Sequence, residues 1–278
     1  MTSPDRAGEA QAIIETARLS TIPHKVEPGG LYVVPTANGA NVVDLTGDKY
    51  RDTPARKEGT VVVHDVASFG AYYGKHADAA SEVFADAGSA RITAVLDAHS
   101  GHARWQAHRL SWQVRTDPHW QTWIASDGKM MSQQEFAEFI EDNAPDVAAD
   151  SPVKAADLIE LAQKFQATTK VTFSQGHRLA SGETQLTYVE ETNASAGRRG
   201  EIQIPPDFSI GVPPFEGGPA YRVKARFRYR ISDGTVRLGY RLNRPEDAAR
   251  DAFEEIAEQV ETGCGATVMR GMPVPPSR

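Results

Sequence analysis

The sequence predicts an α+β protein in which two antiparallel β regions flank a mid-chain cluster of helices, with a further helix near the C-terminus. Alternating and β-branched segments occur between residues 31 and 114 and return over 170–242, with the period of two that is typical of strands. Apolar residues recur at helical spacing between these regions, over 118–165. One more helical segment follows Pro245.

The first β region is preceded by a short helix, expected over residues 8–20. Pro23 ends it, because proline lacks the N–H that a continuing helix needs. Asp65 is placed to cap a second helix after a β-branched run. The last two strands of the region are expected to be joined by a tight turn over 100–103. The expected strands cover residues 31–36, 41–45, 60–65, 81–86, 91–99 and 104–114.

Capping residues mark the mid-chain helices. Asp117 with Pro118 places an N-cap residue directly before a proline. Ser132 with Glu135 forms a capping box. The expected helices cover residues 118–126, 132–144, 153–168 and, before a stop at Gly263, 244–261.

The second β region consists of hairpins. Ser181-Gly182 separates one pair of alternating segments, and residues 232–235 interrupt the longest one. The expected strands cover residues 170–179, 183–192, 201–205, 208–215 and the two halves of 221–242.

The expected organisation is an N-terminal helix and arm over residues 1–30, a single α+β domain over 31–262 and a Pro-rich tail over 263–278. The single Cys264 excludes a disulfide framework and a cysteine-rich zinc site. No apolar run approaches the roughly 18 residues that a membrane span needs. The first residues contain no apolar segment of the kind that a secretion signal has. We therefore expect a cytoplasmic protein that needs no membrane and no cofactor.

The strongest functional signal is a row of cations on one face of the segment 221–242. Alternation places the apolar residues of this segment on one face and its basic residues on the other. Residues 221–244 carry a net charge of +7, whereas the whole chain carries −7. Adjacent like charges repel, so such a row needs solvent or a polyanion. The candidate binding residues are Arg222, Lys224, Arg226, Arg228, Arg230, Arg237 and Arg241.

Two interpretations of this row stay open. In the first, it follows a nucleic-acid backbone without reading bases, because arginine donates two parallel hydrogen bonds to phosphate. In the second, it meets the acidic segment 132–160, within the subunit or across an oligomer interface. The acidic interface candidates are Glu135, Glu138, Glu141 and Asp142.

A weaker signal is the group Asp97, His99 and His108, whose side chains are of types that bind zinc, manganese or iron. The spacing matches no metal motif, so no metal ligand is assigned. If the three converged, they would suit a metal-dependent nuclease. In the structural interpretation, Asp97 and His99 cap or cross-link a strand end, and His108 packs between tryptophans.

Several strings together resemble the YfdQ-like family of phage and prophage proteins, a domain of unknown function. They are SFGAYYGKH, ITAVLDAH, WQAHR, SQQEFAEFIEDN and FEGG followed by AYRVKARFRYRI, and they lie between Val61 and Phe253. FAEFIEDN is the most specific of them. The resemblance implies a phage or prophage origin and the host cytoplasm, and it implies no catalytic residue.

The leading hypothesis is a non-enzymatic protein that self-assembles and presents the basic face to a polyanion, with DNA or RNA the expected partner. The alternative is a structural or shell-forming homo-oligomer. In that case the basic hairpin of one subunit docks on the acidic helices of its neighbour, and such head-to-tail contacts close into rings or continue as filaments.

Overall fold

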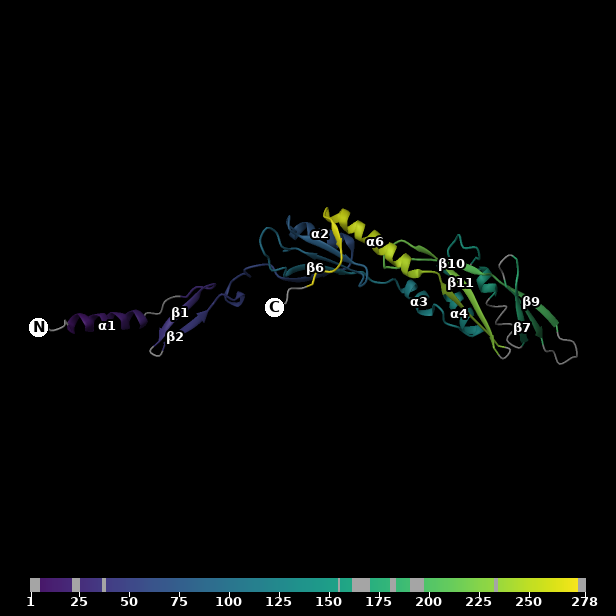
Figure 1. Ribbon diagram of the computed structural model, residues 1–278, viewed down its shortest axis with the longest axis horizontal. Helices are drawn as coiled ribbons and strands as arrows, with labels where there is room; N and C mark the ends of the chain where they lie inside the picture. Colours follow the sequence, from purple (N-terminus) through teal and green to yellow (C-terminus); the bar gives the residue numbers. More distant parts are fainter. Residues whose placement is uncertain are drawn as a thin grey trace. The chain divides into compact units, whose positions relative to one another are not determined.

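The computed structural model describes residues 6–21, 26–36, 39–154, 156–161, 171–180, 184–190, 198–232 and 235–274. The chain divides into two compact units, Met1–Glu58 and Gly59–Arg278 (Figure 1). Parts of the predicted third mid-chain helix, the predicted turn at Ser181-Gly182 and residues 233–234 of the predicted interruption at 232–235 lie outside the described residues.

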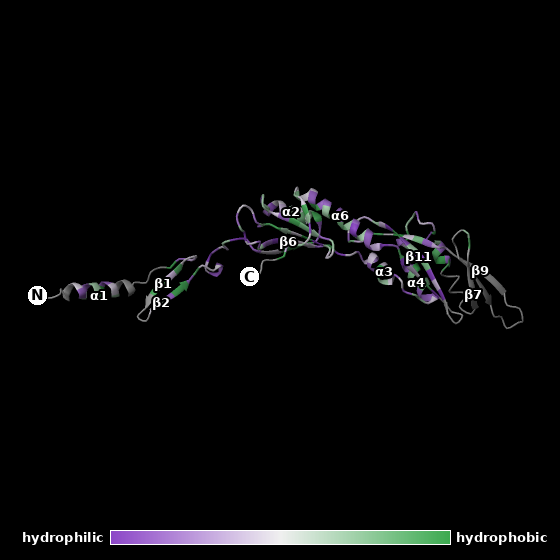
Figure 2. Ribbon diagram, viewed as in Figure 1, coloured by the Kyte–Doolittle hydropathy of each residue, from purple (hydrophilic) through white to green (hydrophobic). Residues whose placement is uncertain are grey.

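The first unit contains the helix α1 (Arg6–Thr21), a hairpin of β1 (Leu31–Thr36) and β2 (Gly39–Asp44), and a 3-10 turn over Asp48–Tyr50. The two strands pair antiparallel and form a sheet of their own, although the sequence prediction begins the large domain at residue 31. Val33 lies opposite Val42, and the two are 62% and 63% exposed (Figure 2). The apolar side chains of this hairpin are therefore exposed and are not buried in a core.

The second unit contains a five-stranded sheet with the order β13-β4-β5-β6-β3. The α+β class is confirmed, but this β region is mixed and not antiparallel: β3 pairs parallel to β6, and β13 parallel to β4. In each parallel pair the strands are joined through intervening helices, a connection that parallel neighbours require. The strands are β3 (Gly59–Val63), β4 (Glu82–Asp86), β5 (Arg91–Val95), β6 (His108–Gln113) and β13 (Val268–Arg270).

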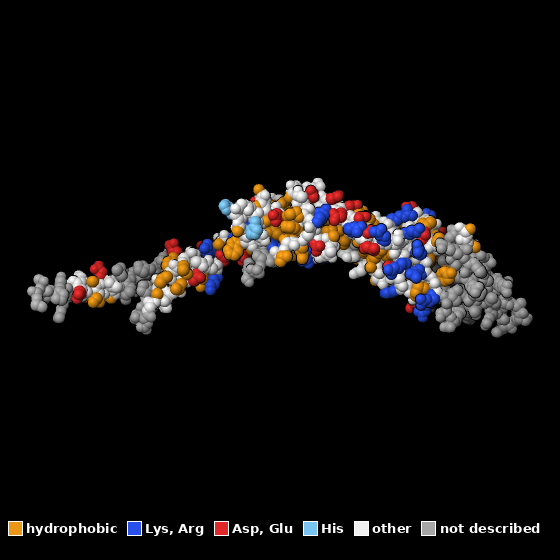
Figure 3. Space-filling view, viewed as in Figure 1, with side chains coloured by type: hydrophobic (Ala, Val, Ile, Leu, Met, Phe, Trp, Pro, Cys, Tyr) orange, Lys and Arg blue, Asp and Glu red, His pale blue; other side chains and the backbone are white. Residues whose placement is uncertain are grey.

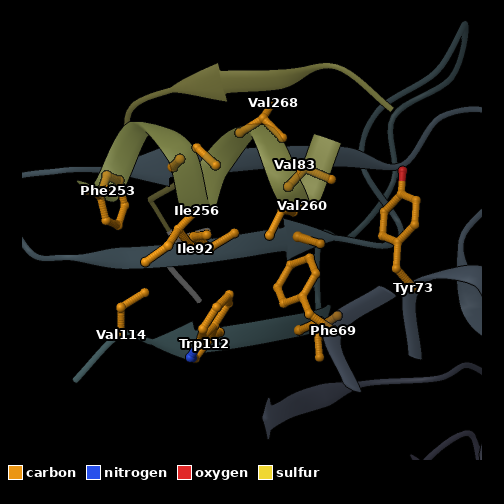
Figure 4. Packing of buried hydrophobic residues seen from close by; sticks show 14 of the residues in the cluster. Phe69, Tyr73, Val83, Ile92, Trp112, Val114, Phe253, Ile256, Val260 and Val268 are labelled. Atoms are coloured by element: carbon orange, nitrogen blue, oxygen red, sulfur yellow. The ribbon is translucent and has the colours of Figure 1, made fainter. Parts of the chain in front are cut away.

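Two helices, α2 (Val66–His76) and α6 (Pro245–Cys264), pack on one face of this sheet. Side chains of α6 point toward the strands, where Phe253 and Val260 lie in one core with Ile92 (Figure 4). The predicted cap of α2 is confirmed, because the Asp65 carboxylate accepts a hydrogen bond of 2.7 Å from the backbone N–H of Ser68.

The glycine predicted to stop α6, Gly263, lies two residues before the one that does. The helix continues through Gly263 and ends before Gly265, which adopts the left-handed φ of 61°. The backbone of Gly263 packs against Gly70 of α2, where an added Cβ would lie 3.3 Å from the Gly263 carbonyl oxygen. The missing side chain of Gly70 therefore lets α2 approach α6 closely.

A second core in the same unit lies under a three-stranded antiparallel sheet, β10-β11-β12. The helices α3 (Pro118–Ser126) and α4 (Gln133–Asp142) supply Trp123, Phe136 and Ile140 to this core, all buried. Residues 156–161 are helical and add Leu158 and Leu161. The strands of this sheet are β10 (Asp207–Val212), β11 (Tyr221–Ser232) and β12 (Thr235–Leu242). Another antiparallel sheet of three strands consists of β7 (Val171–Arg178), β8 (Thr184–Glu190) and β9 (Arg198–Ile204).

The second core is built from a segment inserted into the sequence of the first. The chain leaves the five-stranded sheet after β6, forms α3 to β12, and returns at α6. Helix α6 contacts both cores, because Ala248 and Ala249 pack against the second while Phe253 and Val260 lie in the first. Helix α6 therefore joins the two parts of this unit.

Two connections differ from the sequence prediction. β5 and β6 are joined by a loop over residues 96–107 and not by a tight turn. The loop is closed by Asp97, whose two carboxylate oxygens accept hydrogen bonds from the backbone N–H groups of Ala107 and His108.

The tail predicted over 263–278 contributes β13, and the buried Arg109 guanidinium donates to the carbonyl oxygens of Pro273 and Val274. The C-terminal segment is thus bound to the sheet through residue 274.

Replacing Phe136 by alanine tests the second core. Phe136 is 1% exposed and lies within 6.0 Å of the Phe227 ring, so its removal should leave a cavity and destabilise the unit by about 3–5 kcal/mol. The control is Glu138→Gln on the exposed side of the same helix, which should change stability by less than about 1 kcal/mol. Urea unfolding of both variants measures the difference, and equal stability would contradict the assignment.

Candidate functional site

The basic residues occupy the outer face of the β10-β11-β12 sheet. Along β11, Val223 and Ala225 are buried in the core, whereas the cations that alternate with them are exposed. Lys and Arg side chains gather over these strands (Figure 3). All seven candidate cations are exposed, and their positions on β11 and β12 place them on this one face, which we call the basic face: Arg222, Lys224, Arg226, Arg228, Arg230, Arg237 and Arg241.

Loops close both edges of this sheet. Along β12, Met131 exchanges backbone hydrogen bonds with Leu238, and Gly128 donates to Tyr240. Along β10, Ala148 donates to the carbonyl oxygen of Ser209. Because these loops already pair with N–H and C=O groups at the two edges, a further strand cannot add to the sheet at those positions. The same loops supply acids to the margins of the face.

The outer cations of the basic face pair with these acids. Arg222 Nη1 lies 2.6 Å from Asp150 Oδ2, and Arg241 Nη1 lies 3.5 Å from Asp127 Oδ2. Lys224 Nζ lies 2.7 Å from Asp207 Oδ2 on β10. The three basic side chains are still 52–59% exposed, so each pair contributes little to stability. Of these three acids only Asp150 belongs to the acidic segment 132–160, so the other two pairs were not predicted from the sequence.

The centre of the basic face is different. Among the residues that the structure describes, Arg226, Arg228 and Arg230 form no ion pair with an acid. Arg226 lies directly opposite Arg241 across the β11–β12 ladder, and Arg230 directly opposite Arg237. Like charges in such cross-strand positions repel, with Cβ atoms about 5 Å apart. The centre thus combines positive charge with an incomplete set of counterions.

One end of the face approaches α4. Hydrogen bonds from the backbone N–H and hydroxyl of Ser132 lower the pKa of Glu135, and the nearby charge of Arg237 lowers it as well. The other acidic candidates, Glu138, Glu141 and Asp142, are exposed on α4. That helix packs on the apolar face of the sheet, through Phe136 and Ile140. Most of the acidic candidates and the basic face are therefore on opposite sides of one layer.

The basic face is hollowed at its centre. A groove of about 580 Å³ is lined by four cations, Lys224, Arg226, Arg228 and Arg241, and by Phe227, Tyr229, Leu242 and Asn243. Four cations around one recess are suited to the oxygens of phosphate groups, because arginine presents a planar fork of donors.

The loop that packs on β12 carries an exposed cation, Lys129, that the sequence prediction did not include. The carbonyl oxygen of Lys129 lies over Gly239, at the place where a Cβ on β12 would stand, and Lys129 is exposed. Gly128, with φ of 76°, leaves room for the Arg241 guanidinium. The missed signal is the turn at Asp127-Gly128, which is followed at once by Lys129, three residues before the N-cap Ser132.

The three low-ranking metal candidates each have a role in the fold. Asp97 binds the backbone N–H groups of Ala107 and His108, and His99 Nδ1 accepts from the N–H of Arg104. The ring of His108 lies edge-on to the rings of Tyr72 and His76, with centroids 6.1 and 5.6 Å away. In the described part of the chain, no group of three or more His, Cys, Asp or Glu side chains could hold a metal ion.

These features define an α+β protein with two cores and an exposed basic sheet face. The chain belongs to the DUF2303 family of uncharacterized conserved proteins, whose model matches residues 7–273. No curated protein and no solved structure shows significant similarity to it. None of the helices in the described ranges is both long and apolar enough to cross a membrane.

Replacing Gly239 by alanine tests the packing of the Lys129 loop on the basic face. A Cβ there would overlap the Lys129 carbonyl oxygen, which is backbone, so the loop must shift. We expect a loss of about 1–3 kcal/mol in the free energy of unfolding. The control is Gly74→Ala in α2, where nothing lies within 4 Å; it should be neutral or stabilising. A Gly239→Ala protein as stable as this control would show that the loop does not pack there.

Proposed function

We propose that this protein binds nucleic acid through the basic face, without sequence specificity, and that it self-assembles. The observation that carries the proposal is the centre of the face, where Arg226, Arg228 and Arg230 form no ion pair among the described residues and two arginine pairs face each other across the ladder. A polyanion would relieve that repulsion. Phosphate contacts of this kind position a protein on nucleic acid but carry no sequence information.

A phage or prophage origin forms part of the proposal. Its support is the resemblance of the strings from SFGAYYGKH to AYRVKARFRYRI to the YfdQ-like proteins. Self-assembly is supported by the first unit, where the valines of the β1–β2 hairpin are exposed. An isolated two-stranded hairpin is at best marginally stable in water, and exposed apolar patches mark interaction surfaces. Further copies of the chain would bury those valines.

Reversing the charge at the centre of the face tests the binding. Arg226→Glu combined with Arg228→Glu should weaken binding at least tenfold at 50 mM salt, and equally for unrelated sequences, because only phosphate contacts are lost. The control is Lys75→Glu combined with Arg115→Glu, two exposed cations outside the face that change net charge by the same amount. Fluorescence anisotropy measures the affinities.

The salt dependence provides a second measurement on the unmodified protein. Between four and seven neutralised phosphates should give a slope of log affinity against log salt of about −4 to −6. Binding to no DNA or RNA at low salt, or equal weakening by both double variants, would refute the proposed role of the face.

A second function is favoured by the placement of the acidic candidates. Glu138, Glu141 and Asp142 lie on the side of the sheet layer opposite the basic face. Two copies stacked in the same orientation would therefore bring acids against cations. Such a contact is heterologous and propagates into rings or filaments. In this alternative the protein is a structural homo-oligomer, and the basic face is covered by its neighbour.

Neutralising the acidic side separates the two functions. If copies stack, Glu138→Gln with Glu141→Gln should lower the molar mass measured by light scattering and should expose the basic face, strengthening nucleic-acid binding. The control is Glu258→Gln with Glu261→Gln, which removes the same charge from exposed positions of α6. Unchanged molar mass in both variants would reject stacking and leave the basic face free for phosphate.

A further inference from the structure

We infer that β3 is a docking strand, and that the β1–β2 hairpin of a second copy of the chain adds to its outer edge. This inference rests on the self-assembly in the proposed function, for which it names the surface. β3 ends the five-stranded sheet, and in the described part of the chain only β6 pairs with it. Its residues, Gly59–Val63, include no charge and no proline, and their register with β6 is regular. Sheet edges are usually protected by charges, prolines or bulges, so this edge is open to a further strand.

The backbone groups of β3 point alternately to two sides. Gly59 donates its N–H to the carbonyl oxygen that directly precedes β6, so Gly59, Val61 and Val63 direct their N–H and C=O groups toward β6. Thr60 and Val62 lie between these residues and direct theirs away from the sheet. Because Val61 is 37% exposed and Val62 57%, the edge also presents an exposed valine on each face.

The hairpin offers a matching edge on β2. Leu45 donates its N–H to the carbonyl oxygen of Gly30, so alternation along the strand directs the backbone groups of Val42 and Ala40 away from β1. On β1 the position opposite Ala40 also points outward, and it is Pro35, which has no N–H. Of the two edges of the hairpin, the one on β2 is therefore suited to pairing with a further strand.

The side chains of the two edges suit each other. Residues 39–43 of β2 are uncharged, as are all five residues of β3. Each strand carries consecutive exposed valines, Val42 and Val43 on β2 and Val61 and Val62 on β3. Consecutive residues point to opposite faces, so pairing of the strands brings valines together on both faces of the sheet. It would bury apolar side chains that the isolated hairpin exposes.

The added strand comes from another copy of the chain. Within one chain β1 and β2 form a sheet of their own, and β3 pairs with β6 in a different sheet. A two-stranded hairpin is at best marginally stable in water, so both partners gain from the contact. Each copy has one hairpin and one β3, and the exchange therefore closes a dimer or continues from copy to copy.

Proline substitutions on the two edges test the inference in the full chain. Val62→Pro and Val42→Pro each remove an outward N–H and leave the bonds to β6 and β1 in place, so each should lower the molar mass measured by light scattering. The matched control is Val33→Pro, opposite Val42 on the β1 edge, which should keep the molar mass of the unmodified protein. Urea unfolding of the Val62→Pro variant checks that its second unit is folded. Unchanged molar mass in both edge variants would overturn the inference.

Cross-linking between two differently tagged chains identifies the copy that supplies the strand. Both chains carry Cys264→Ala, and one carries Val42→Cys while the other carries Val62→Cys. After co-expression, a short bis-maleimide should join the two chains, with little product from either chain expressed alone. A cross-link that forms only inside a chain carrying both cysteines would overturn the inference, because the hairpin would then add to its own β3.

Failure of the inference differs from failure of the proposed function. If Val33→Asp with Val42→Asp lowers the molar mass and Val62→Pro does not, self-assembly stands and the hairpin docks on another surface. An unmodified protein with the molar mass of one chain would refute the proposed self-assembly itself.

Discussion

The alternation of side chains along β11 is the constraint on which the rest of the second unit depends. This strand is the middle one of its sheet, so its apolar residues are buried beneath α3 and α4 while the intervening positions face outward. A shift of one residue in its pairing would place every arginine in the core. The burial of Val223 and Ala225 therefore keeps the cations on one surface, and it offsets the repulsion between them.

The position of the face within the unit depends on segments shared by the two cores. The turn that joins β10 to β11 carries Phe215, which packs 6.2 Å from the ring of Phe253 in the first core. Tyr221, the first residue of β11, packs there too, and burial together with the Glu255 carboxylate raises the pKa of its phenol to about 12. Because α6 also contacts both cores, the β10-β11-β12 sheet is tied to the five-stranded sheet at several points.

Local patterns were enough to predict most elements but few of their partners. The Asp117 cap, the Ser132–Glu135 capping box and the long alternating segment carry their signals within a few residues, so α3, α4, β11 and β12 were predictable from the sequence. β13 is three residues long, too short for any period to appear. Asp127 and Asp150 pair with cations far along the chain, from loops that follow sheet edges, and no local pattern indicates such contacts. Asp97 and His99 match metal chemistry by residue type, although their hydrogen bonds serve the backbone.

The insertion of one core into the sequence of the other sets an order in which the chain can fold. The five-stranded sheet needs both β3 and β13, so a nascent chain cannot complete it until residue 270 has been synthesised. The inserted segment, in contrast, contains all the strands that it pairs. Contacts between distant residues form slowly, because the intervening loop must close first. During that interval β4 has an open edge, and a strand from another chain can occupy it before β13 arrives.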